Sequence, residues 1–135
     1  MSIADIRRMC GSGVMVSSEK RQTYLHRTPL SLSEATGWRA IYILEPDDDD
    51  LWTDEPLLAW CVFHHEERPV AGATGSAVDH GNHIEGVVHS GTDLGSYPDS
   101  AQNVGNFWHY RRIDDPDPTR DEARAEQARR ERRKR

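Results

Sequence analysis

Apolar side chains become scarce near the C-terminus of this 135-residue chain, and this distribution limits where a core can form. Residues 1–113 hold 45 of the 48 apolar residues, and residues 114–135 add only three alanines. Because folding depends on burying apolar surface, the core must come from the first 113 residues. The sequence therefore predicts a globular domain over residues 1–113, an acidic, proline-containing linker over 114–118, and a basic C-terminal helix or tail over 119–135.

Charge is divided along nearly the same boundary. Residues 1–118 carry 19 acids and 9 bases, a formal charge of −10, whereas residues 119–135 carry 8 bases and 4 acids, a formal charge of +4. An acidic body repels nucleic acid and anionic lipid, while a basic tail attracts anionic partners. The tail is thus expected to dock on an acidic protein surface or on nucleic acid, or to fold back on its own body.

The sequence favours a cytoplasmic protein with no membrane contact. Its longest apolar run, "LLAWCVF", has seven residues, whereas a membrane span needs about 20. The N-terminus lacks the apolar region of a signal peptide. The two cysteines, Cys10 and Cys61, form no C-x-x-C motif, which fits a reduced compartment. The size and composition would also suit a phage or mobile-element protein, which could be virion-associated.

Four apolar runs predict strands, at residues 38–44, 57–64, 83–89 and 106–112. The turns and acidic loops between them favour antiparallel pairing. A stripe of apolar residues predicts a short helix over residues 2–10. The expected fold class is α+β, with a small, mainly antiparallel, curled sheet or barrel-like roll, a short N-terminal helix and a charged C-terminal helix. The residues expected in the core are Ile41, Ile43, Trp60, Val62, Ile84, Val88 and Phe107.

The C-terminal segment has the pattern of a helix without an apolar face. Thr119 and Glu122 have capping-box spacing, no Gly or Pro follows them, and Glu126 and Arg130 are spaced for a favourable ion pair. Such a helix is marginal by itself in water. The residues expected to bind a partner through this tail are Arg129, Arg130, Arg132, Arg133, Lys134 and Arg135.

The stretch "DHGNHIEGVVHSGTD", residues 79–93, is the densest cluster of possible metal ligands. His80, His83 and Glu85 could hold zinc if the chain curls at Gly81. If residues 83–89 form a strand, however, His83 and His89 lie about 20 Å apart and cannot share an ion. The favoured interpretation is a set of solvated polar side chains. A metal-dependent enzyme or sensor is the alternative.

The segment "EPDDDDLWTDEP", residues 45–56, is expected to connect two strands as a solvated acidic loop. It could instead engage a basic host protein, as an inhibitor that imitates nucleic acid would. Trp52 within it is either an exposed partner contact or an anchor tucked under the loop. No nucleophile or phosphate-binding motif is present. The leading hypothesis is therefore a non-enzymatic interaction or accessory protein that docks through its basic tail.

Overall fold

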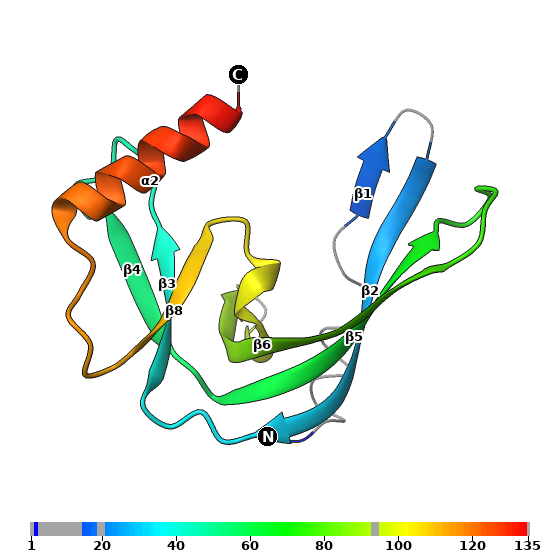
Figure 1. Ribbon diagram of the computed structural model, residues 1–135, viewed down its shortest axis with the longest axis horizontal. Coiled ribbons are helices and arrows are strands. Elements are labelled where there is room, and N and C mark those ends of the chain that lie inside the picture. The colour runs from blue at the N-terminus through cyan, green and yellow to red at the C-terminus, as the bar shows by residue number, and fades with distance from the viewer. Residues whose placement is uncertain (1, 3–14, 19–20, 93–94, 135) are drawn as a thin grey trace.

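The computed structural model describes residues 2, 15–18, 21–92 and 95–134, with side chains described for residues 2, 23–89 and 98–134. Within these residues the chain forms two antiparallel sheets and a C-terminal α-helix (Figure 1). The predicted α+β class with a curled, mainly antiparallel sheet is confirmed. The predicted N-terminal helix lies, apart from residue 2, outside the described residues.

The larger sheet is strongly curled, and one end of it projects away from the rest of the molecule (Figure 1). Its strand order is β1-β2-β5-β6-β7, with each neighbouring pair antiparallel. The predicted strands at residues 57–64 and 83–89 belong to β5 and β6, which extend well beyond those limits. The strands are β1 Met15–Ser18, β2 Arg21–Ser33, β5 Ala59–Pro69, β6 Val78–Thr92 and β7 Gly95–Ser100.

The smaller sheet lies between the larger sheet and the C-terminal helix. Its order is β4-β3-β8, so β3 is the central strand. Both faces of β3 are buried, as its double-sided apolar pattern predicts. Its strands are β3 Trp38–Ile43, β4 Trp52–Pro56 and β8 Phe107–Arg112, and the short 3-10 helix η1, Ala101–Asn103, precedes β8.

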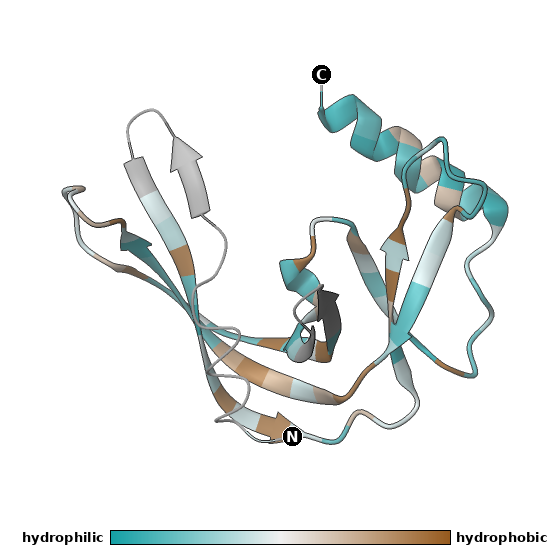
Figure 2. Ribbon diagram, turned by 180° about the vertical axis from the view of Figure 1, so that it is seen from behind, coloured by the Kyte–Doolittle hydropathy of each residue, from teal (hydrophilic) through white to brown (hydrophobic). Residues whose placement is uncertain are grey.

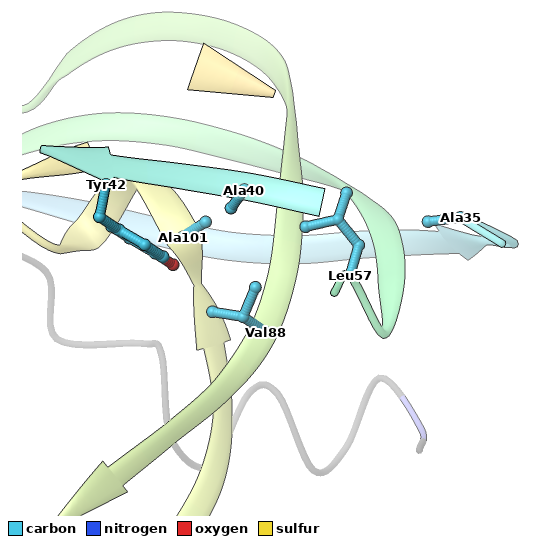
Figure 3. Close-up of a cluster of buried hydrophobic side chains, with 6 residues drawn as sticks. All are labelled: Ala35, Ala40, Tyr42, Leu57, Val88 and Ala101. Carbon is cyan, nitrogen blue, oxygen red and sulfur yellow. The ribbon is translucent and has the colours of Figure 1, made fainter. Parts of the chain in front are cut away.

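The main core forms where the two sheets meet (Figure 3). Its buried members are Ala35, Ala40, Tyr42, Leu57, Val88 and Ala101, and four half-buried aromatic residues pack around them, Trp38, Trp60, Phe107 and Tyr110.

Gly86 permits a close approach within this core. The Gly86 amide donates to the Tyr110 hydroxyl over 2.7 Å, and a Cβ atom at Gly86 would lie 2.6 Å from the Tyr110 ring. Because Gly86 has no side chain, the Tyr110 ring of β8 can pack directly against β6 at this position.

Two sequence expectations are wrong. Ile84, expected in the core, is 65% exposed. Its cross-strand neighbour Val62, also expected in the core, is only half-buried and belongs to none of the core clusters. The segments expected to be loops contain β4 and β7. Both are edge strands rich in polar residues, so hydrogen bonding to β3 and β6 rather than apolar patterning places them.

Candidate functional site

The C-terminal helix, α2 Arg120–Arg133, begins where the capping-box spacing predicts. The Thr119 hydroxyl accepts a hydrogen bond from the Glu122 amide over 3.1 Å. One turn later the expected Glu126–Arg130 ion pair forms, with 2.7 Å between Arg130 Nε and Glu126 Oε2. Acidic residues occupy the first turn and basic residues the last, which complements the helix dipole.

Helix α2 lies against the smaller sheet rather than extending into solvent (Figure 1). Ala123 is fully buried beside Ile43 and Leu51. Gln127 Nε2 donates to the Leu44 carbonyl over 3.1 Å, and Arg130 Nη2 donates to the Phe107 carbonyl over 2.7 Å. The C-terminal segment is therefore folded back on the body of its own chain, which is one of the two positions expected from the sequence.

Arg39 holds the segment that leads into the helix. Arg39 lies on β3, and its charged side chain is almost fully buried. Its Nη1 atom lies 2.9 Å from Asp54 Oδ2 and 2.8 Å from Asp117 Oδ1, and its Nη2 donates to the Asp115 carbonyl over 3.1 Å. The acidic linker is therefore fixed to β3 and β4 by one guanidinium group. Sequence reasoning missed this role of Arg39.

The tail cations expected to bind a partner fall into two groups. Arg129 and Arg130 both pair with the buried carboxylate of Glu126, and Lys134 lies 3.5 Å from Glu131. Arg132 and Arg133 are exposed and have no ion pair among the described side chains. Arg124, which was not predicted, is exposed in the same way. Arg135 lies outside the described residues.

Trp52 is half-buried beside Ile43, Leu51 and Ala123. The Arg39 guanidinium carbon lies 6.0 Å from the centre of its ring. This position corresponds to the anchor interpretation of Trp52 rather than to an exposed contact.

The acidic loop runs beside the helix. Asp47–Asp50 are exposed, and the Asp48 carboxylate accepts from the Asp50 amide over 3.2 Å. A groove of about 720 Å³ lies between this loop, the turn at Gly105 and the second half of α2. The loop side of the groove carries Glu45 and Asp48, and the helix side carries Arg130, Glu131, Arg133 and Lys134.

The histidine-rich stretch, as far as Thr92, forms part of β6. His80 occupies an irregularity in the pairing with β5, and its Nε2 lies 3.1 Å from Glu67 Oε2. His83 Nε2 hydrogen-bonds the His80 carbonyl over 2.9 Å, and its ring stacks on His65 at 4.2 Å between centroids. The two histidines proposed as zinc ligands therefore have separate hydrogen-bond partners.

Glu85 is fully buried and joins four parts of the larger sheet. Its Oε2 accepts from His65 Nε2 over 2.5 Å, and its Oε1 accepts from the Ser100 hydroxyl over 2.6 Å. Arg27 Nε lies 3.3 Å from Oε1, and Arg27 Nη1 donates to Asn103 over 2.8 Å. Sequence reasoning selected Glu85 for a different role and missed its partners, which come from separate strands and from the end of β7.

The geometry of this cluster differs from that of a hydrolytic triad. The Ser100 hydroxyl donates to the carboxylate, so His65 is not placed to accept its proton as a general base would. Among the described residues, no three His, Cys, Asp or Glu side chains are arranged to hold a metal ion. What the arrangement does is tie β2, β5 and β6 to the start of η1 through one buried carboxylate.

No family model, curated protein or solved structure matches the chain. Within the described residues, no helix has the length and apolar character needed to cross a membrane.

Proposed function

We propose that this protein is a non-enzymatic interaction protein that binds an acidic protein surface through the outward face of α2. The observation that carries the proposal is the separation of cations on this helix. Arg130 is committed to the body through its hydrogen bonds to the Gly105 and Phe107 carbonyls, whereas Arg124, Arg132 and Arg133 are exposed.

Helical spacing places Arg124 and Arg132 on one side of the helix, about 12 Å apart along its axis. Between them lie the exposed alanines Ala125 and Ala128. Small side chains allow a partner surface to approach closely, and the arginine side chains can form bidentate contacts with carboxylates. This outward surface, Arg124, Ala125, Ala128 and Arg132, is named the arginine face.

An acidic protein fits the charge of the whole chain better than nucleic acid does. The arginine face belongs to a segment of formal charge +4, but residues 1–118 carry a formal charge of −10. A nucleic acid presents a dense, extended line of phosphates that this body repels at long range. A local patch of carboxylates on a protein is attracted to the arginine face in the same way, but the acidic body repels it less than it repels a long nucleic acid.

Binding of polyglutamate and of a short DNA duplex at low salt tests the proposal. The double variant Arg124→Gln/Arg132→Gln should bind polyglutamate about tenfold more weakly, because two charge-assisted contacts are lost. Arg68→Gln/Arg112→Gln is the matched control, since it removes the same charge from exposed or half-exposed arginines of the body. It should bind almost as well as the wild-type protein.

Three results would overturn the proposal. If neither polyanion binds at low salt, the arginine face is not a docking surface. An equal loss of affinity in both double variants would mean that net charge alone attracts the probe. Tighter binding to DNA than to polyglutamate, with a steep salt dependence, would replace the acidic protein with nucleic acid as the partner.

The acidic loop supports a second candidate function, inhibition of a basic host protein. Asp47–Asp50 are all exposed, and no ion pair to them occurs among the described side chains. Replacing these four residues with Asn should abolish binding to polylysine if the loop is the interface. Unchanged polylysine binding would reject this candidate.

A further inference from the structure

Helix α2 covers apolar side chains but contributes almost none of its own. The cluster beneath it consists of Ile43 and Leu51, with half-buried Trp52 and Trp108 beside them. The buried residues of the helix are Ala123, Glu126 and Gln127, so Ala123 is its one buried apolar residue. Figure 2 shows the helix as hydrophilic along most of its length. A helix held by the hydrophobic effect would bury a broader apolar stripe.

Polar contacts supply the rest of the attachment. Gln127 and Arg130 hydrogen-bond the backbone carbonyls of Leu44 and Phe107. Arg111 Nη2 pairs with Glu122 Oε2 over 2.8 Å. The ion pair is partly exposed, so salt screens it, and water can replace the hydrogen-bonding partners once the helix moves away.

The far end of the helix is incompletely packed. The groove of about 720 Å³ separates its second half from the acidic loop and the turn before β8. Arg130 reaches back to the Gly105 and Phe107 carbonyls from this end. Beyond Gln127, it is therefore the Arg130 side chain that supplies the hydrogen bonds between the helix and the body.

We infer that α2 is a reversible strap that leaves the smaller sheet at high ionic strength and exposes the apolar side chains of Trp52 and Trp108. The strap covers an aromatic surface of its own chain. A released helix of 14 residues loses much of its helicity, because helices of this length are marginal alone in water. The inference does not rest on the proposed function, since salt and intrinsic fluorescence test it without any partner.

Hydrogen exchange of the wild-type chain gives the first test, at about 0.05 M and about 1 M NaCl. Amides in the second half of α2 should exchange at least about tenfold faster than those of β3 at low salt, and faster again at high salt. Amides of β5 should keep their rates. Protection of α2 equal to that of β3 at both salt concentrations would overturn the inference.

A pair of matched variants gives the second test. Ala123→Asp places a carboxylate under the helix, and Ala125→Asp places one on its exposed side, with the same change in charge and nearly the same helix position. Ala123→Asp should shift tryptophan emission to longer wavelength and reduce ellipticity at 222 nm, while the body still unfolds cooperatively. Ala125→Asp should resemble the wild-type chain. Identical spectra for the two variants, or loss of the whole fold in Ala123→Asp alone, would overturn the strap.

Discussion

At the scale of single residues, the decisive feature of the larger sheet is a buried carboxylate. Glu85 has partners on β2, on β5 and at the end of β7. Apolar periodicity can place Glu85 on a strand, but it cannot reveal which polar side chains of other strands share its face. The strand register does reveal these partners. Arg27 on β2 lies opposite His65 on β5, so the two side chains lie on the same face of the sheet.

Replacing Glu85 with Gln should destabilise the fold by about 3 kcal/mol, because the almost fully buried Arg27 loses its charge partner. Urea unfolding monitored by circular dichroism measures the change. Glu66→Gln is the control, since Glu66 pairs with the more exposed Arg68 and should cost less than about 1 kcal/mol. Equal effects of the two substitutions would contradict a structural role for the Glu85 cluster.

Stability should fall as the solution is made acidic. Burial lowers the pKa of His26, His65 and His109 below the ordinary value of 6.5. The unfolded chain therefore binds protons more readily, so the free energy of unfolding decreases as pH falls from about 6.5 through the folded-state pKa values. Hydrogen bonds from Arg111 and Arg129 lower the pKa of Glu122 and Glu126 below 4.5, so these groups contribute only at lower pH. Urea midpoints that stay constant or rise between pH 7.5 and pH 5.5 would refute this expectation.

The zinc hypothesis stays a prediction with a direct test. His80, His83 and Glu85 have separate hydrogen-bond partners, so protein purified without a metal-affinity tag should contain less than about a tenth of an equivalent of zinc. Elemental analysis measures this. Zinc near one equivalent that is lost on His83→Ala would establish the metal site instead.

At the scale of elements, apolar runs predicted β3, β5, β6 and β8 and missed the polar edge strands β4 and β7. Strand β3 and residues 59–63 of β5 are largely apolar on both faces, and both lie in sheet interiors. Strand β4 is acidic and mostly exposed, so nothing in its composition distinguishes it from a loop. Its pairing with β3 depends on backbone hydrogen bonds, which leave no signature in the sequence.

The contact between β6 and β8 gives a sharp prediction at this scale. Gly86→Ala would place a methyl group 2.6 Å from the Tyr110 ring and 2.8 Å from a Leu57 methyl group, so we expect a loss of about 1–3 kcal/mol from overpacking. Gly105→Ala is the control, because its added Cβ meets open space. Thermal unfolding should separate the two variants, and similar melting temperatures would show that β8 adjusts freely.

At the scale of the whole molecule, the composition boundary predicted where the core lies but not where the helix lies. The core clusters come from residues 32–110, with Ala123 as the one contribution from the tail. The sequence left two positions open for residues 119–135, free or folded back. The folded-back position depends on hydrogen bonds from the helix to the Leu44 and Phe107 carbonyls. The positions of these carbonyls are set only when the smaller sheet has assembled, so the sequence alone does not show them.

The central claim is that α2 turns one side to its own body and an arginine face to a partner. Arginine-specific modification followed by mass spectrometry, with and without polyglutamate at low salt, tests both halves of it. Arg124 and Arg132 should react at least about tenfold faster than Arg39 and Arg130, and polyglutamate should protect only the first pair. Equal reactivity of Arg130 and Arg132, or no protection by polyglutamate, would contradict the account.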